Sequence, residues 1–238
     1  DIIVATPGRF LDHMWNGTIS LLKMQILVLD EADRMLDMGF APQINQILEA
    51  LPEERQTLLF SATMPTDVAD LVRASVKDPV RVTIGKTATA ADRAEQALHH
   101  TTREDKTKLL LSLLDADRDS VLVFTRTKHG ADRLGRALGS AGHKVATIHG
   151  DRSLSQRRAA LEGFRRGTFR VLVATDVAAR GIDVANIGHV VNYDMPNSPE
   201  DYIHRIGRTA RVKASGRATS FITSEDHIGL RAIEKLLG

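Results

Sequence analysis

The 238-residue sequence lacks cysteine entirely and contains few aromatic residues, which make up 4% of the chain. Without cysteine there is no disulfide framework, no zinc site with thiolate ligands and no thiol nucleophile. No uninterrupted apolar run approaches the roughly 18 residues of a membrane-spanning helix, so we expect no membrane association. These absences leave a globular protein whose chemistry depends on oxygen and nitrogen groups.

The residues that are present indicate two units of opposite charge. Hydrophobic residues make up 42% and charged residues 26%, which is ordinary for a folded protein. Residues 1–85 carry 7 Lys and Arg against 12 Asp and Glu, whereas residues 86–238 carry 25 against 18. The basic second part is suited to polyanions. The chain begins with Asp1 rather than Met, which favours a piece of a longer protein.

Short β-rich runs alternate with longer helical patterns, and this order predicts an α/β fold with a largely parallel sheet. The helical patterns include residues 127–140, with Leu134 and Leu138 on one face, and residues 154–166. Continuous apolar strands such as 26–29 favour sheets that are covered on both faces. The expected strands are Ile2–Ala5, Ile26–Asp30, Thr57–Ser61, Val80–Ile84, Ala97–Thr101, Val121–Phe124, Val145–His149, Val171–Ala174, His189–Asn192 and Ala218–Ile222.

A small, polar stretch at 85–91 lies where the charge balance changes sign, so we predict a linker over 85–95. It separates a front domain, residues 1–84, from a rear domain, residues 96–238. Gly85-Lys86-Thr87 is similar to the end of a phosphate-binding loop, but that loop needs a glycine at the position of Val80. The stretch is therefore interpreted as linker.

Two carboxylates, Asp30 and Glu31, directly follow the apolar run 26–29. Parallel sheets bind ligands at the carboxyl ends of their strands, and nucleoside-triphosphate hydrolases place a magnesium-binding acid and a water-orienting acid there. Asp30 then holds Mg²⁺, through its water shell, and Glu31 polarises the attacking water. The alternative is an acidic turn that begins a helix.

Hydroxyl groups follow two other front strands. Ser61 and Thr63 come after residues 57–60, where they can bond Asp33 at the neighbouring strand end or cap the helix after Pro65. Thr6 precedes Pro7, Gly8 and Arg9, a pattern typical of a helix start that also offers amides and a guanidinium to a phosphate.

The rear domain holds two further motifs. Residues 174–183, Ala-Thr-Asp-Val-Ala-Ala-Arg-Gly-Ile-Asp, leave a strand through small side chains that let a nucleotide or nucleic-acid backbone approach. Residues 204–211, His-Arg-Ile-Gly-Arg-Thr-Ala-Arg, place Arg208 and Arg211 three positions apart. Such guanidiniums can stabilise a transferring phosphate, or form a solvated basic face.

In this order the motifs resemble the DEAD-box family of ATP-dependent RNA helicases, with a bacterial-type core that is truncated at its N-terminus. The resemblance runs from Thr6 to Arg211 and implies two RecA-like α/β domains, the first incomplete, that bind ATP and Mg²⁺ between them and RNA across both. It implies catalytic roles for Asp30, Glu31, Arg208 and Arg211, and coupling of hydrolysis to unwinding by Asp33, Ser61, Thr63 and His204. The resemblance also implies that Gly181 and Asp183 contact the nucleotide and that Phe124 supports its strand. It implies contacts with the RNA backbone for Thr6, Gly8, Arg9, Arg126, Gly150, Asp151 and Thr175.

The sequence departs from the family pattern at three places. Leu154 stands where a Gln often lies before Arg157, and Ser153 with Gln156 is equally typical of a helix capping box. Ala210 replaces a common glycine. The adenine-reading motif, the phosphate-binding loop and the first RNA motif, which precede Thr6 in the family, are not in these residues. The front domain is therefore expected to lack the strands and helices that cover one side of its sheet.

The resemblance therefore predicts a cytoplasmic RNA helicase that separates short duplexes, while the printed residues alone are expected to be ATPase-deficient. Backbone contacts and sparse aromatics imply weak sequence preference for RNA, and protein partners could bind through tails outside these residues. The alternatives are a DNA helicase of the same superfamily and a non-catalytic RNA-binding or annealing module.

Overall fold

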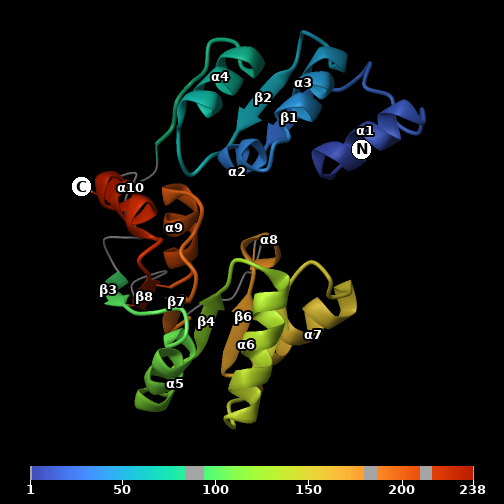
Figure 1. Ribbon diagram of the computed structural model, residues 1–238. Helices are drawn as coiled ribbons and strands as arrows, with labels where there is room; N and C mark the ends of the chain where they lie inside the picture. The colour runs from blue at the N-terminus through green and yellow to red at the C-terminus, as the bar shows by residue number, and fades with distance from the viewer. Residues whose placement is uncertain (1, 84–93, 180–186, 210–215, 238) are drawn as a thin grey trace. The chain divides into compact units, whose positions relative to one another are not determined.

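The computed structural model describes residues 2–83, 94–179, 187–209 and 216–237. Its contacts divide the chain into two units, residues 1–87 and 88–238. Each unit combines helices with a parallel sheet (Figure 1), so the predicted α/β class is confirmed.

The first unit contains a two-stranded parallel sheet in which Leu27 pairs with Thr57 and Leu29 with Leu59. Its elements are α1 (Pro7–Trp15), β1 (Ile26–Leu29), α2 (Ala32–Asp37), α3 (Ala41–Ala50), β2 (Gln56–Leu59) and α4 (Thr66–Ser75). Leu29 packs with residues of α2, α3 and α4, and Leu27 also contacts the cluster around Leu11 of α1.

The opposite face of this sheet is exposed. Ile26 and Val28 are 53% and 52% exposed, and Leu58 lies beside Val28 on the same face. The cover on both faces that the apolar pattern of 26–29 favours is therefore not present in the described residues, and the expected lack of cover on one side of the first sheet is confirmed. The helices of this unit supply apolar side chains to one face only.

Two predicted strands are also absent from the described residues of the first unit. Residues 2–5 and 80–83 have extended or irregular backbone, and Ile2, Val4 and Val80 are at least 90% exposed. Ile84 lies outside the described residues. A β-rich run forms a strand only when a partner strand satisfies its backbone groups, and β1 and β2 pair with each other instead.

The second unit has a six-stranded, all-parallel sheet in the order β3-β8-β7-β4-β6-β5. Its elements are β3 (Ala94–His100), α5 (Lys106–Ala116), β4 (Val121–Phe124), α6 (Lys128–Ser140), β5 (Val145–Ile148), α7 (Leu154–Arg165), β6 (Val171–Ala174), α8 (Asp176–Ala179), β7 (His189–Asn192), α9 (Pro199–Ile206), β8 (Gly216–Ile222) and α10 (His227–Leu237). β3 begins inside the stretch 85–95 that the sequence favours as linker.

Helices cover both faces of this sheet. Val121 and Val123 of β4 pack with Leu110 of α5 and Leu134 of α6, whereas Leu122 of β4 packs with residues of α7 and α8. A third cluster joins β3 and β8 to α9 and α10. All residues of β4, β6 and β7 are buried. This is expected for β4 and β6, which are continuous apolar strands between two helical layers, whereas β7 also buries the polar residues His189 and Asn192.

Local sequence signals place the helix starts. The Thr127 hydroxyl accepts a hydrogen bond from the Gly130 amide and caps α6. Ser153 and Gln156 form the complete capping box at the start of α7. The Gln156 side chain therefore has a structural role, because it accepts a hydrogen bond from the Ser153 amide at the start of α7.

His189 makes the second unit sensitive to acid. It is 5% exposed, and its Nε2 lies 2.8 Å from Thr219 Oγ1. Burial lowers the pKa of His189, so below pH 6.5 the unfolded chain binds a proton that the folded chain does not. We expect His189 to cost up to about 1.4 kcal/mol of unfolding free energy per pH unit below 6.5.

Urea unfolding at pH 7.5 and 5.5 measures this effect. His189→Gln should reduce the loss of stability between the two pH values, whereas His129→Gln, at an exposed histidine, should leave it unchanged. An equal loss in wild type and His189→Gln would contradict the assignment.

No described helix is long and apolar enough to cross a membrane.

Candidate active site and nucleic-acid interface

The acid pair lies at the carboxyl end of β1, where the strand turns into α2. The Phe60 amide donates to the Leu29 carbonyl (2.8 Å), and the Ala32 amide donates to the Phe60 carbonyl (2.9 Å). These two bonds hold the loop of Asp30 and Glu31 against the end of β2. The sequence prediction that both carboxylates follow a parallel strand matches this geometry.

Glu31 has a left-handed backbone, with φ 52° and ψ 50°. A non-glycine residue in this region carries a conformational cost of about 1–3 kcal/mol, and such residues concentrate at functional sites. Its amide donates to Asp30 Oδ1 (2.9 Å), and its Oε2 lies 3.1 Å from Arg34 Nη1. The backbone and Arg34 together set the direction of the Glu31 carboxylate.

The Asp30 carboxylate is exposed. In the described part of the structure, no group of three or more His, Asp or Glu side chains could hold a metal ion. Mg²⁺ is commonly held by one or two carboxylates, waters and substrate phosphates rather than by a cage of protein ligands. An exposed carboxylate at a strand end fits that mode of binding.

Asp33 joins the ends of β1 and β2. It is 2% exposed, and its Oδ2 accepts hydrogen bonds from the amide and the hydroxyl of Thr63, both at 2.8 Å. The Asp33 amide donates to Ser61 Oγ (3.2 Å), which donates to the Thr63 carbonyl (2.7 Å). The expected bond between the carboxylate and a hydroxyl is confirmed for Thr63; Ser61 bonds the backbone of Asp33 instead. Neither caps α4, whose N-cap is Pro65.

The start of α1 presents the other predicted front residues. Thr6 occupies the N-cap position, but its side chain makes no capping hydrogen bond, and Pro7 is the first helical residue. A Cβ added at Gly8 would meet nothing within 4 Å. The Arg9 side chain is 66% exposed, with Asp12 3.5 Å away. This helix start is open to a ligand.

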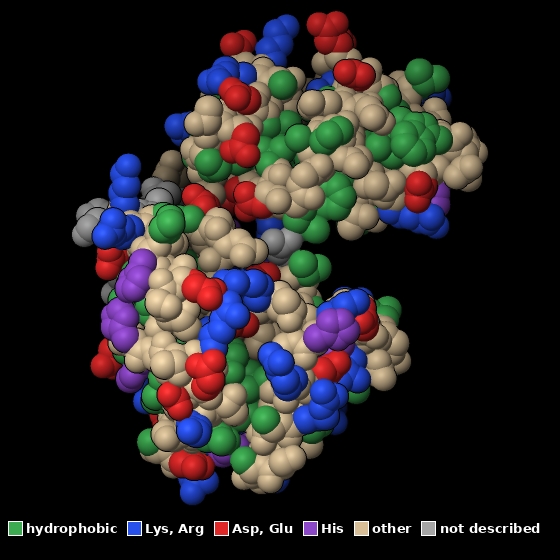
Figure 2. Space-filling model, in the orientation of Figure 1, with side chains coloured by type: hydrophobic (Ala, Val, Ile, Leu, Met, Phe, Trp, Pro, Cys, Tyr) green, Lys and Arg blue, Asp and Glu red, His purple; other side chains and the backbone are tan. Residues whose placement is uncertain are grey.

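The parallel order of the second sheet brings four predicted RNA-contacting residues to one edge. Arg126 follows β4, Gly150 and Asp151 follow β5, and Thr175 follows β6, so all lie beyond carboxyl ends. A Cβ at Gly150 would meet nothing within 4 Å, so the backbone there is open to close approach. Figure 2 shows Lys and Arg side chains on the visible face of this unit, interspersed with Asp and Glu.

Two of these residues are held by ion pairs. The Arg126 amide donates to Asp194 Oδ2 (3.0 Å), and its Nη2 lies 3.8 Å from Asp226 Oδ1. Lys128 Nζ donates to Asp151 Oδ1 (3.0 Å), and this hydrogen bond lowers the pKa of Asp151. The loop after β5 therefore carries a paired, ionised carboxylate.

The arginine motif lies on and after α9. His204 is in the last turn of α9, and the amide of Arg208, just beyond it, donates to the Arg205 carbonyl (3.1 Å). Arg211, Gly181 and Asp183 lie outside the described residues.

Comparisons with known proteins agree with this arrangement. Residues 1–71 match the DEAD/DEAH box helicase family model, and residues 105–213 match the helicase conserved C-terminal domain. The chain belongs to the DEAD-box RNA helicase family. Its α/β fold, with sheets of two and six strands, corresponds to two RecA-like domains of which the first is partial.

Individual DEAD-box relatives are similar over the whole chain. The ATP-dependent RNA helicase RhlB of Pseudomonas syringae pv. tomato is 47% identical, over 100% of this chain and 61% of its own length. The ATP-dependent RNA helicase DBP2 of Candida albicans is 47% identical over 94% of this chain and 41% of its own. A structure of S. cerevisiae Dbp5 L327V bound to RNA and ADP BeF3 matches with a TM-score of 0.86 and 35% identity, over 100% of this chain and 63% of that one. The chain thus spans less than two thirds of these relatives.

The DEAD-box motifs also contain two buried arginines that sequence reasoning missed. Arg34 is 7% exposed and pairs with Glu31, a contact that their spacing of three on a helix could have indicated. Arg205 is 2% exposed and pairs with Asp176, 29 residues away, so no local pattern points to it.

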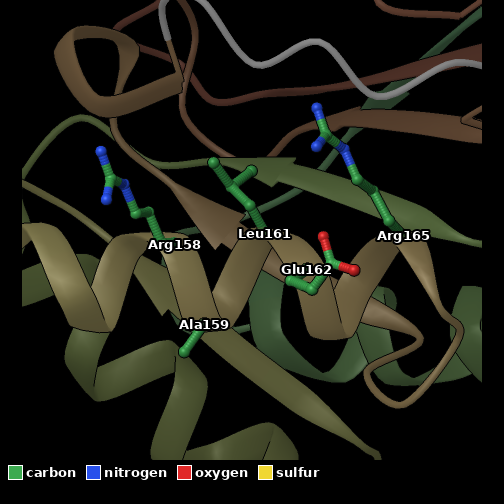
Figure 3. A pocket seen from close by; sticks show the side chains of 5 residues that line it. All are labelled: Arg158, Ala159, Leu161, Glu162 and Arg165. Carbon is green, nitrogen blue, oxygen red and sulfur yellow. The ribbon is translucent and has the colours of Figure 1, made fainter.

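A surface pocket lies on the second unit, on the helix that follows β5. It runs along α7 and is lined by Arg158, Ala159, Leu161, Glu162 and Arg165 (Figure 3). None of the predicted site residues contributes to it, so it is not part of the candidate site.

Proposed function

We propose that the full-length protein containing these residues is an ATP-dependent RNA helicase that hydrolyses ATP to separate short RNA duplexes. The observation that carries this proposal is the acid pair at the end of β1, with the left-handed Glu31 and the two hydrogen bonds that the Asp33 carboxylate accepts from Thr63. Similarity to Dbp5, whose structure is bound to RNA and ADP BeF3, supports both ligands.

In the proposed reaction, Asp30 would help to hold Mg²⁺ through water, and the ion would supply positive charge to the phosphates. Glu31 orients and polarises the attacking water, because its carboxylate is held at the strand end by Arg34 and by its own backbone. Arg208 and Arg211 stabilise charge on the γ-phosphate, while Gly181 and Asp183 contact the nucleotide.

The RNA strand contacts groups of each unit through its phosphates and sugars. Thr6, Gly8 and Arg9 provide the contacts of the first unit, and Arg126, Gly150, Asp151 and Thr175 those of the second. These are backbone contacts, so binding is expected to be weakly dependent on sequence. Asp33, Ser61, Thr63 and His204 couple the phosphate state to RNA binding.

ATP hydrolysis by the full-length protein, with and without nucleic acid, tests the proposal. Single-stranded RNA should stimulate hydrolysis, and DNA of the same sequence should not, because the 2′-hydroxyl distinguishes the two. Equal stimulation by DNA would favour a DNA helicase. RNA annealing that survives without any hydrolysis would favour a non-catalytic RNA-binding module.

The 238 printed residues alone should show no RNA-stimulated ATPase activity. They contain no glycine-rich loop with the lysine that cradles the β- and γ-phosphates, so the groups that would hold these phosphates of Mg-ATP are missing. Turnover that depends on RNA and is abolished by Glu31→Gln in this polypeptide would overturn the expectation.

A further inference from the structure

Arg205 is the most completely buried arginine among the described residues of the candidate motifs, at 2% exposure. A guanidinium stays protonated in proteins, and burying it is costly unless its donors are all satisfied. Here the cost is met by partners from several separate segments of the second unit.

The Arg205 guanidinium contacts the carboxyl ends of three strands. Its Nε and Nη2 form a bidentate pair with Asp176, at 2.6 and 2.7 Å, just after β6. Its Nη1 donates to Asn192 Oδ1 (3.1 Å) and to the Asp194 carbonyl (2.7 Å), at the end of β7. Its Cζ lies 4.9 Å from the centroid of the Phe124 ring, at the end of β4.

On one side, these partners lead directly to groups of the proposed RNA interface. Asp176 follows Thr175 in the chain. The Asp194 carboxylate accepts the Arg126 amide (3.0 Å) and Lys106 Nζ (3.0 Å). The orientation of Thr175 and Arg126 therefore depends on segments that Arg205 holds.

On the other side, Arg205 is adjacent to the proposed phosphate site. Its carbonyl accepts the Arg208 amide, and the next residue, Thr209, is 1% exposed and donates from Oγ1 to the Ile187 carbonyl (2.5 Å). Arg208 is thus fixed to the end of α9, whose position is set by the Arg205 side chain.

We propose that Arg205 is a positioning residue that links RNA binding to nucleotide binding, by fixing the segments of Thr175 and Arg126 relative to Arg208. This inference rests on the proposed helicase function. Buried ion pairs often add little net stability, whereas a bidentate guanidinium imposes a defined geometry on its partners. The four directed bonds of Arg205 are suited to transmitting position.

The test uses the full-length protein and the variant Arg205→Lys. Lysine keeps the charge but loses the planar fork, so it cannot hold Asp176, Asn192 and Asp194 together. The readout is the ratio of the RNA dissociation constants without and with a non-hydrolysable ATP analogue, which measures coupling between the two ligands. Arg205→Lys should lower this ratio at least about fivefold.

The matched control is Arg217→Lys. Arg217 also forms ion pairs with two carboxylates, Asp117 and Asp119, but its side chain is 40% exposed and contacts neither ligand site. The Arg217→Lys variant should keep the wild-type ratio of RNA dissociation constants. A thermal unfolding scan of each variant separates a loss of folding from a loss of coupling.

Asp176→Asn provides a second route if Arg205→Lys does not fold. It keeps a hydrogen-bond acceptor but removes the charge, and it too should lower the coupling ratio. A folded variant of either kind with the wild-type ratio would show a purely structural role. The proposed function has its own readout, an ATPase assay of the wild-type protein with ATP, in which a lack of RNA-stimulated hydrolysis would overturn it.

Discussion

Replacing Glu31 by Gln in the full-length protein should lower the RNA-stimulated kcat for ATP at least about 100-fold. Proton transfer by a positioned carboxylate contributes about 10²–10⁴ to such rates. Gln keeps the shape and can still accept the bond from Arg34, so ATP and RNA affinities should change by less than about threefold. Steady-state kinetics with saturating RNA give both quantities.

Glu53→Gln is the control for the loss of one negative charge in the first unit. Glu53 is exposed and lies between α3 and β2, away from the acid pair. Its kinetics should equal those of the wild type. Wild-type turnover by Glu31→Gln would remove this residue from the reaction.

Replacing Thr63 by Val should separate unwinding from hydrolysis. Valine has nearly the same shape but lacks the hydroxyl that donates to Asp33 Oδ2, while the Thr63 amide can still donate to that atom. The connection between the ends of β1 and β2 is weakened without change to Asp30 or Glu31. We expect the rate of duplex separation to fall at least about tenfold, while kcat for ATP stays within about threefold.

A fluorescent duplex assay, run beside the ATPase assay, measures this separation. Thr66→Val, at an exposed threonine in the first turn of α4, should affect neither rate. Equal losses of unwinding and hydrolysis in Thr63→Val would place Thr63 in the chemical step rather than in coupling.

Much of the second unit could be predicted from local patterns. The apolar runs of β4 and β6 are continuous because helices cover both faces of their sheet, and the starts of α6 and α7 follow from Thr127 and Ser153. The first unit was less predictable. Residues 26–29 have the same apolar pattern, yet one face of β1 is exposed, because periodicity does not report whether a second layer of helices is present.

The sequence has no cysteine, so the chemistry of its motifs depends on side-chain oxygen and nitrogen groups. Most of these groups could be identified from the sequence. The order of the acid pair, the hydroxyls after β2 and the arginine string at 204–211 indicated the family by itself. Local chemistry can show this, because each motif is a short, continuous string at the end of a strand or helix.

The tertiary structure decided which of these groups meet. Only the pairing of β1 with β2 brings Thr63 to the Asp33 carboxylate, across 30 residues. Only the packing of α9 over the sheet turns Arg205, one of several arginines in a basic string, into a buried group bonded to Asp176. The physical reason is that burial and hydrogen bonding depend on neighbours distant in sequence, which local composition and spacing do not encode.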